Sequence, residues 1–435
     1  MGVSDLLAPD DASPDDASPD GAAPTDPAAD ELLSSTILTD AGRQDPYVAY
    51  AQLRDGVARW RTDTGSVVLT RYDDCLEALR HPKLGRAEAD MELPVSIAGN
   101  DRRVTENAST MLLINPPDHT RIRSLVSRAF TPRRVEELRN TIDDLLQPVL
   151  DRFAEHGGGD VMDDLAVPYP VAVISELLGV PKDGNEHIRP LVRAATALID
   201  PASSPETTAA GEAAIMQLGL YFFELAEEKR RAPDDRLLSA LIQVEEAGDR
   251  LSMEELIANT ILLYAAGFET TSNLIGNGLR LLMRHPDEMD RLRSRPTLIG
   301  SAIMEMLRAD SPVQMNVRVA LETVELFGET HRRGASFIVL QGSANHDSAV
   351  YPDGERFDVA RFATGDAPQP LSFGWGAHHC LGAHLARAEG EIVFRALLDR
   401  FARIELDTAT LPDGVPVFRP SFTLRGLESL PVRVS

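Results

Sequence analysis

The chain has 435 residues, of which 43 are basic and 68 acidic, giving a formal net charge of −25. It exceeds an ordinary small domain and, with 43% hydrophobic residues, can bury a large core. So acidic a chain lacks the basic footprint that nucleic acid binding needs. Its two cysteines, Cys75 and Cys380, are far apart, which favours a reducing, cytoplasmic setting over a disulfide scaffold. No stretch resembles a targeting segment or a membrane span, so we expect no membrane association.

The start of the chain is strongly acidic. Ten acidic residues precede the first basic one, Arg43, and residues 10–20 read DDASPDDASPD. Such a repeat of acids, small residues and prolines cannot bury enough surface to order itself. We therefore predict a disordered, solubilising tail over residues 1–38 and one folded domain over residues 39–435. A docking tail for a basic partner is the functional alternative.

The folded part is predicted to contain many helices and a minority of short strands. Alternating residues over 58–70 predict strand structure, and residues 72–79 a helix. Thr131 and Pro132 predict an N-cap and a first helical turn, and the glycines at 157–159 end that helix. Further helices are expected at 161–178, 186–199, 206–231, 236–242, 252–284, 286–293, 298–310 and 383–401, with strands at 317–326, at 336–340 and near the C-terminus. The expected fold class is mainly α with smaller β-sheets (α+β).

The most informative segment is residues 371–387, LSFGWGAHHCLGAHLAR. Three glycines, Gly374, Gly376 and Gly382, surround Cys380, and a helix begins just beyond it. Glycines allow sharp turns and close approach to a bulky group, while backbone amides and a helix N-terminus stabilise a negative sulfur. The local chemistry therefore favours a thiolate.

The residues alone leave the role of that thiolate open between metal ligand, nucleophile and redox thiol. His378 and His379 next to Cys380 suggest zinc, but no second Cys or His cluster supplies the usual spacing. A cysteine nucleophile with a distant base is another alternative, and a buried cysteine in a tight turn is the simplest one. For Cys75, within RYDDCLEAL, we favour plain core packing.

Phe373, Gly376, Cys380 and Gly382 match the pattern F-x-x-G-x-x-x-C-x-G. This segment resembles the haem-binding loop of the cytochrome P450 family. The resemblance implies a triangular prism-like haem domain, haem b as cofactor, and Cys380 as the thiolate ligand of its iron, which pushes electron density toward the metal. It also implies that Phe373 packs near the sulfur, and that Gly374 and Gly382 lie against the porphyrin.

The long helix expected at 252–284 has an unusual polar centre, AGFETT at residues 266–271. A mid-helix threonine such as Thr270 can bond back to the carbonyl of Ala266 and distort the helix, so a polar kink is the simple interpretation. The segment resembles the oxygen-binding A-G-x-E-T-T segment of the same family. That resemblance implies that Ala266 and Gly267 leave room for a small ligand, that Thr270 orients a proton donor, and that Glu269 relays protons from solvent.

Two further motifs support the resemblance. Glu305 and Arg308 are three residues apart and share a helical face; an isolated pair is usually an ordinary surface contact worth under about 1 kcal/mol. With Arg361 of the FDVAR segment, they resemble the family's structural E-R-R triad. Likewise NPPDHTRIR, an exposed basic helix by itself, resembles the segment that holds the haem propionates. The resemblance implies this role for four residues: His119, Arg123, Arg318 and His378.

The resemblance implies a monomeric haem-thiolate monooxygenase that hydroxylates or epoxidises an organic substrate, as in the tailoring of natural products. The substrate would contact residues 91–112, 174–205, 263–270, 313–317 and 421–423. No flavin or nicotinamide motif is visible, so electrons would come from a ferredoxin and its reductase, docking on a basic patch. That patch would consist of Arg121, Arg123, Arg128, Arg133 and Arg134. The alternatives are an atypical haem-thiolate enzyme (peroxygenase, coupling or rearrangement), a non-catalytic haem-binding protein and, remotely, a cysteine hydrolase.

Overall fold

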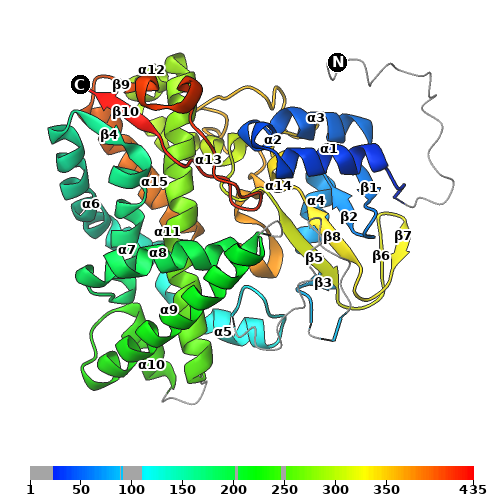
Figure 1. The fold of residues 1–435 in the computed structure, drawn as a ribbon, viewed down its shortest axis with the longest axis horizontal. Coiled ribbons are helices and arrows are strands. Elements are labelled where there is room, and N and C mark those ends of the chain that lie inside the picture. The colour runs from blue at the N-terminus through cyan, green and yellow to red at the C-terminus, as the bar shows by residue number, and fades with distance from the viewer. Residues whose placement is uncertain (1–22, 89, 92–109, 201–203, 246–250) are drawn as a thin grey trace.

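The computed structural model describes residues 23–88, 90–91, 110–200, 204–245 and 251–435. A helix-rich part and a sheet-containing part lie side by side (Figure 1). The longer helices are α1 (Pro27–Leu38), α3 (Tyr47–Gly56), α4 (Tyr72–Arg80), α5 (Asp118–Val126), α6 (Pro132–Glu155), α7 (Pro168–Leu178), α8 (Asn185–Thr196), α9 (Pro205–Arg231), α10 (Leu237–Glu245), α11 (Met253–Arg284), α12 (Pro286–Ser294), α13 (Ile299–Ala309) and α15 (Ala383–Arg400); α2 (Asp40–Gln44) and α14 (Gln341–Ala344) are short. The expected mainly helical fold with smaller sheets is confirmed.

The main sheet has the strand order β1-β2-β8-β5-β3, in which only β2 and β8 are parallel neighbours. Its strands are β1 (Arg59–Arg61), β2 (Val67–Leu69), β3 (Leu84–Gly85), β5 (Asn316–Ala320) and β8 (Ser336–Val339). A second sheet, β4-β10-β9, joins β4 (Gly158–Asp160), β10 (Pro431–Val434) and β9 (Ile404–Leu406), and a hairpin joins β6 (Val324–Leu326) to β7 (Glu329–His331). The C-terminal strand thus returns to the helix-rich part, as Figure 1 shows.

The prediction of a tail that extends to residue 38 is wrong over residues 27–38, which form α1. The Asp26 side chain caps this helix by accepting the Ala29 N–H at 2.8 Å. Leu33 and Ile37, four residues apart on one helical face, are buried, and the Trp60 indole N–H donates to Asp30 at 2.7 Å. Apolar spacing and a cap therefore outweigh the acidic composition here. The repeat at residues 10–20 lies outside the described residues.

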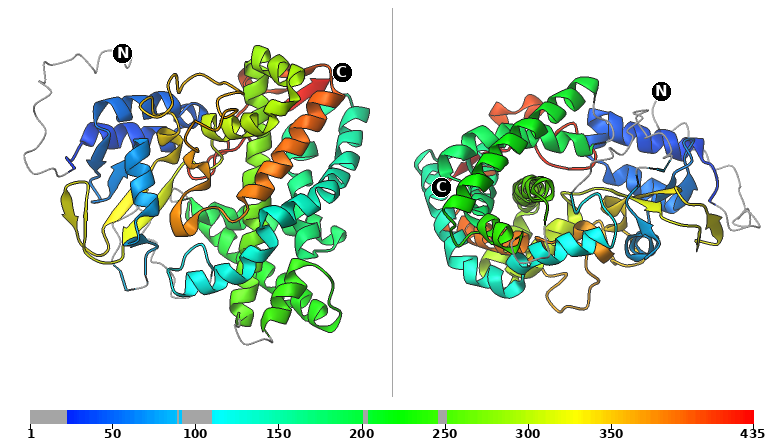
Figure 2. Two further views of the ribbon diagram at one scale, coloured as in Figure 1. Left: turned by 180° about the vertical axis from the view of Figure 1, so that it is seen from behind. Right: turned by 90° about the horizontal axis from the view of Figure 1, so that it is seen from below.

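Helix α11 runs through the middle of the molecule and is seen nearly end-on in the right-hand view of Figure 2. Ser252 and Glu255 form a reciprocal capping box at its start, with the Glu255 N–H 3.1 Å from the Ser252 hydroxyl. The helix packs against α7, α9, α13 and α15. Because it is surrounded, its centre can place polar groups deep inside the protein.

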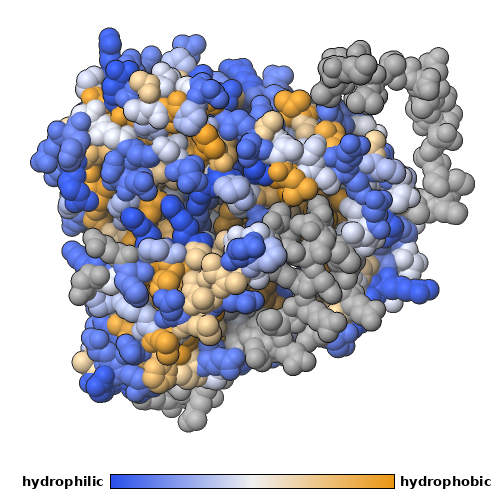
Figure 3. Space-filling model, in the orientation of Figure 1, coloured by the Kyte–Doolittle hydropathy of each residue, from blue (hydrophilic) through white to orange (hydrophobic). Residues whose placement is uncertain are grey.

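The face shown in Figure 3 is mainly hydrophilic, but apolar residues lie among the hydrophilic ones near α8 and α9. The large exposed apolar residues of α9 are Ile215, Met216, Leu220 and Phe223. Met216, Leu220 and Phe223 share one helical face because they are four and three residues apart. A net charge of −25 counteracts the association that such a strip favours.

Candidate active site

The cysteine loop is held in a shape that requires its glycines. The Cys380 N–H donates to the Phe373 carbonyl at 2.8 Å, which closes the loop just before α15. Gly376 has a φ of 70°, and a Cβ there would lie 2.6 Å from the Leu79 carbonyl oxygen. A Cβ on Gly382, by contrast, would meet no atom of the described residues within 4 Å. Gly376 is thus needed by the chain itself, whereas Gly382 leaves space for another group.

The surroundings of the Cys380 thiol differ from the expectation that local chemistry favours the thiolate. Burial raises its pKa above the ordinary value, although the Gly382 N–H and the Arg123 guanidinium lower it. Desolvation outweighs the Gly382 N–H and the Arg123 guanidinium, and a cation bound at the sulfur would favour its anionic form. Among the described residues, no three His, Cys, Asp or Glu side chains gather as a metal-ion site.

The residues expected to hold propionates lie together beside the loop. The rings of His119 and His378 are 4.3 Å apart, and the Arg123 guanidinium donates to the His379 carbonyl at 2.6 Å. Arg318 is buried, and its Nη1 donates to the Val317 carbonyl at 3.1 Å.

Arg86, which sequence reasoning missed, joins this cationic cluster of Arg86, His119, Arg123, Arg318 and His378. Its Nη1 donates to the same Val317 carbonyl at 3.1 Å, and its Nε is buried without a partner. No sequence signal marks Arg86, since it follows a strand of two residues.

The cationic cluster is short of negative charge. Burial, followed by the nearby Arg86, Arg318, His119 and Arg123, lowers the pKa of His378 to about 2, and burial lowers the pKa of Arg318 to about 9. In the described part of the chain, no ion pair joins Arg86, Arg123 or Arg318 to a carboxylate. Guanidinium groups that are buried or partly buried in this way need anionic partners. The two propionates of haem b fit this need, and the iron is a cation of the kind that favours the anionic form of Cys380.

The centre of α11 behaves as expected at Thr270. Its hydroxyl donates to the Ala266 carbonyl at 3.0 Å, as predicted. Ala266 is exposed and Thr270 half-buried, although their neighbours Ala265 and Glu269 are buried. These two residues therefore face accessible space from the middle of a surrounded helix.

Gly267 does not have the position expected for a residue that leaves room for a small ligand. A Cβ on Gly267 would lie 2.8 Å from side-chain atoms of Ile174 in α7. The absence of a side chain is therefore explained by the close packing of α7 on α11. Helical geometry is the reason, since one position along the helix turns a residue by roughly 100° away from the Ala266 face.

Glu269 is buried, and its carboxylate forms an ion pair with Arg419 from the C-terminal segment. A second guanidinium nitrogen of Arg419 donates to the Asn273 side chain, one turn further along α11. The expected acid therefore has a cationic partner that sequence reasoning missed. Because the two residues are 150 positions apart, the sequence carries no local signal of this pair.

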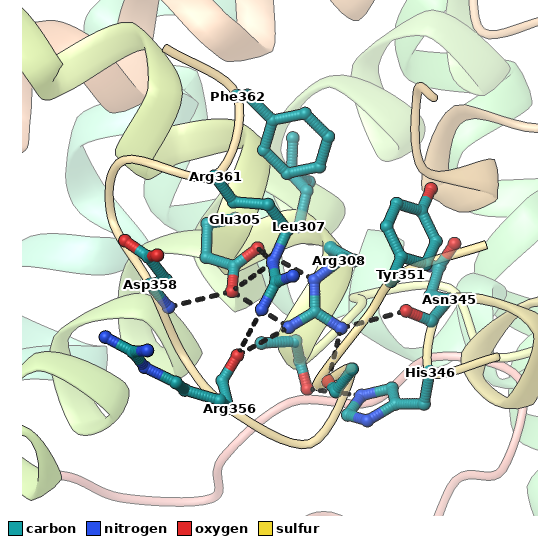
Figure 4. Close-up of polar contacts among 12 residues, drawn as sticks. Glu305, Leu307, Arg308, Asn345, His346, Tyr351, Arg356, Asp358, Arg361 and Phe362 are labelled. Atoms are coloured by element: carbon teal, nitrogen blue, oxygen red, sulfur yellow. Dashed lines mark hydrogen bonds and ion pairs between the residues drawn. The ribbon is translucent and has the colours of Figure 1, made fainter. Parts of the chain in front are cut away.

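Glu305, Arg308 and Arg361 are brought together as the resemblance implied (Figure 4). Arg308 makes a bidentate contact with Glu305 at 2.7 and 2.8 Å, and Arg361 donates to the same carboxylate at 3.1 and 3.2 Å. Arg308 also donates to the carbonyls of Asn345 and Gly354 at 2.9 and 2.7 Å. The triad thus joins α13 to the irregular segment that leads to the cysteine loop, and its role in maintaining the pocket stays a prediction.

One bound group fits the whole site if it offers a metal cation to the Cys380 sulfur and two carboxylates to the cationic cluster. A site of this kind defines a haem-thiolate enzyme. The family model for cytochrome P450 matches residues 57–414. The chain belongs to this family: it is a cytochrome P450 monooxygenase with haem b as its cofactor, and it uses redox partners and an organic substrate.

Its similarity to individual members is extensive. The chain is 40% identical to cytochrome P450 107B1 of Saccharopolyspora erythraea, over 91% of this chain and 96% of that protein. It is 38% identical to the cytochrome P450 monooxygenase PikC of Streptomyces venezuelae, over 89% of this chain and 91% of that protein. A solved myxobacterial cytochrome P450 in complex with myristic acid has a TM-score of 0.82 and 35% identity, covering 92% and 99% of the two chains. Of the helices described, none has the length and apolarity needed to cross a membrane.

Proposed function

We propose that this monooxygenase hydroxylates or epoxidises a medium-sized natural product as a tailoring step of secondary metabolism. Similar proteins support this: one is 35% identical and named 6-deoxyerythronolide B hydroxylase, from Saccharopolyspora erythraea, and another is 37% identical and named polyketide biosynthesis cytochrome P450 PksS, from Bacillus subtilis. The expected substrate segments at 174–200, 263–270, 313–317 and 421–423 are described, whereas 92–109 and 201–203 lie outside the described residues.

The observation that supports the site assignment most strongly is that Arg86, Arg123 and Arg318 lie together near Cys380, bonded to backbone carbonyls and, in the described part of the chain, to no carboxylate. In the proposed roles, Cys380 ligates the haem iron, and the cationic cluster holds the propionates by charge-assisted hydrogen bonds. Bound haem would supply an iron centre that activates dioxygen, with the thiolate favouring cleavage of its O–O bond.

The chain's own groups would manage the protons. The Thr270 hydroxyl, fixed by the Ala266 carbonyl, would orient a proton donor in the accessible space. The Glu269 carboxylate would pass protons inward, and Arg419 would keep it in place. The presence of both the acid and the alcohol favours oxygen activation over a non-catalytic haem carrier.

The test of the site is the absorption spectrum of the reduced protein bound to carbon monoxide. We expect the strongly red-shifted Soret band that is typical of thiolate ligation. A spectrum with an unshifted band would contradict the assignment of Cys380. Replacement of Arg318 by Ala should lower haem retention while it leaves the band of the remaining holoprotein in place, because it removes an anchor and not the ligand.

Thr270→Ala is predicted to uncouple oxygen consumption from product formation. A positioned proton donor contributes about a hundredfold or more to a rate, so we expect several-fold more hydrogen peroxide per NADPH oxidised. Thr271→Ala is the matched control, because the Thr271 hydroxyl is buried and donates to the Gly267 carbonyl at 3.3 Å. Unchanged peroxide yield in Thr270→Ala would contradict the role of this hydroxyl.

For the electron donor, we propose a ferredoxin served by its reductase, docking where α5 leads into α6. The expected basic patch is divided in the structure: Arg121 pairs with Asp118 and Glu255 at 3.1 and 2.5 Å, and Arg123 points to the cysteine loop. Arg128, Arg133 and Arg134 are exposed, although the latter two share Glu137. These three therefore offer their charge to an acidic partner.

We predict that the double change Arg128→Glu and Arg133→Glu slows reduction by a ferredoxin about tenfold at low ionic strength, because charge at an interface rim mainly sets the association rate. Stopped-flow reduction under carbon monoxide measures this rate, and the effect should fade as salt rises. Arg395→Glu, at an exposed position on α15, is the control. Equal slowing by the control would mean that net charge, and not this face, decides the rate.

We further propose that the enzyme is a monomer in the cytoplasm. Cys75 and Cys380 are both free thiols, which agrees with a reducing compartment. Sedimentation at micromolar concentration tests the oligomeric state, and Leu220→Glu tests whether the apolar strip of α9 contributes to any association.

A further inference from the structure

The carboxylate of Asp200 clamps a turn near the C-terminus. One of its oxygens, Oδ2, accepts the Ser421 hydroxyl at 2.7 Å, the Phe422 N–H at 2.6 Å and the Thr423 N–H at 3.3 Å. Asp200 is 6% exposed and directly follows the 3₁₀ turn Ala197–Ile199 at the end of α8. Three donors on one buried oxygen make a strong contact, because hydrogen bonds to charged groups are the more stabilising ones.

The same turn carries the partner of Glu269. Arg419 lies two residues before Ser421, and the Ser421 N–H donates to the Arg419 carbonyl at 2.7 Å. At the far side, the Gln314 N–H donates to the Thr423 carbonyl at 3.0 Å. The segment from Arg419 to Thr423 is thus anchored by Asp200 to the chain that follows α8, and by the ion pair with Glu269 to α11.

We infer that Asp200 is a positioning residue for the acid Glu269. The inference rests on the proposed role of Glu269 in proton delivery. Asp200 contacts the turn, and the turn carries Arg419, which contacts Glu269, so Asp200 acts through the turn and Arg419. When the clamp is lost, the turn is free to shift and Arg419 shifts with it. Glu269 would then remain buried with its cation displaced, which changes the orientation of its carboxylate.

The end of α8 belongs to a segment expected to contact substrate, and Glu269 belongs to the machinery for protons. The same short turn contacts Asp200 and, through Arg419, Glu269. A change in the position of the substrate-contacting segment can therefore change the position of the Glu269 carboxylate. The physical link is short. The Asp200 carboxylate accepts three donors of the turn, one backbone hydrogen bond joins Ser421 to Arg419, and one ion pair joins Arg419 to Glu269.

The first measurement is hydrogen exchange in the holoenzyme of Asp200→Ala. We expect the amides of the 421–424 segment to exchange about tenfold faster or more, the factor that corresponds to losing a hydrogen bond to a charged group. We also expect faster exchange on α11 near Glu269. Asp200→Asn keeps an oxygen acceptor and should restore part of the protection. Asp399→Ala, an exposed site on α15, is the control. Faster exchange confined to the turn would overturn the inference.

The second measurement is hydrogen peroxide per NADPH oxidised, with a surrogate ferredoxin and reductase and without added substrate. Asp200→Ala should raise this yield several-fold toward the value of Arg419→Gln, and the double variant should not exceed Arg419→Gln alone, because residues in one chain of contacts are not additive. An additive double variant, or an unchanged yield, would overturn the inference.

Two further experiments distinguish a failure of the inference about Asp200 from a failure to fold and from a failure of the proposed function. If Asp200→Ala does not fold, Ser421→Ala removes one of the three donors and should give the same pattern at smaller size. If the carbon monoxide spectrum of the unmodified enzyme lacked the thiolate band, the proposed function would fail. Exchange coupled between the turn and α11 would still report on the clamp.

Discussion

Cys380→Ser is expected to abolish the red-shifted Soret band of the reduced, carbon monoxide-bound protein, together with its monooxygenase activity. A serine hydroxyl keeps the size of the side chain but is a far poorer donor to iron than a thiolate, so the electron donation that favours cleavage of dioxygen is lost. The loop itself should persist, because its closing contact uses the backbone N–H of residue 380 and the Phe373 carbonyl.

Cys75→Ser is the matched control for this change. Cys75 is buried between α4 and the main sheet, where its thiol lies 3.3 Å from the Leu69 carbonyl, and burial raises its pKa well above the ordinary value. A serine can donate to the same carbonyl, so the band should remain. A thiolate band that persisted in Cys380→Ser, or vanished only in Cys75→Ser, would contradict the assignment of the ligand.

The second large effect is expected for Arg308→Ala. Arg308 and Glu305 are both 0% exposed, and Arg308 also satisfies three backbone carbonyls, those of Asn345, Gly354 and Arg356. Its removal leaves a buried carboxylate with Arg361 as the remaining cation, and takes the Arg308 donor from the Asn345 and Gly354 carbonyls, whereas Arg361 still donates to the Arg356 carbonyl at 2.7 Å. Breaking a buried pair in this way costs about 3–5 kcal/mol. Because folded domains are stable by only about 5–15 kcal/mol, we expect little folded holoprotein.

Denaturant unfolding and the haem content after purification measure this loss. Arg308→Lys keeps the charge but not the planar fork, so it should be intermediate. Arg395→Ala breaks an exposed pair with Asp399 and should change the free energy of unfolding by under about 1 kcal/mol. An Arg308→Ala enzyme with full haem content and ordinary stability would show that the triad is not needed for the pocket.

Local patterns determined much of this protein. The N-cap at Thr131, the start of α11 at Ser252 and the back-bonded Thr270 all depend on neighbours within four residues, and each was predictable. The cysteine loop is also recognisable in the sequence. The positive φ of Gly376 and the open space beside Gly382 both favour a residue without a side chain. Short-range constraints of this kind are written into adjacent residues.

Two predictions made from local composition were wrong because tertiary packing outweighed the local preference. The acidic stretch before Arg43 includes α1, whose Leu33 and Ile37 pack with Trp60. The pKa of the Cys380 thiol also departs from the local expectation, because burial by distant elements outweighs the nearby amides. The burial of α1 and that of the Cys380 thiol could not be predicted from their own segments alone.

The sequence by itself determined the family and the order of most helices, since these depend on short motifs and periodicity. Only the tertiary structure decided the partners over long chain distances: Arg419 beside Glu269, Arg86 in the cationic cluster, and Asp200 beside the C-terminal turn. The physical reason is that an ion pair or a buried hydrogen bond depends on distance in space. Residues separated by 150 to 230 positions leave no periodic trace when the fold brings them together.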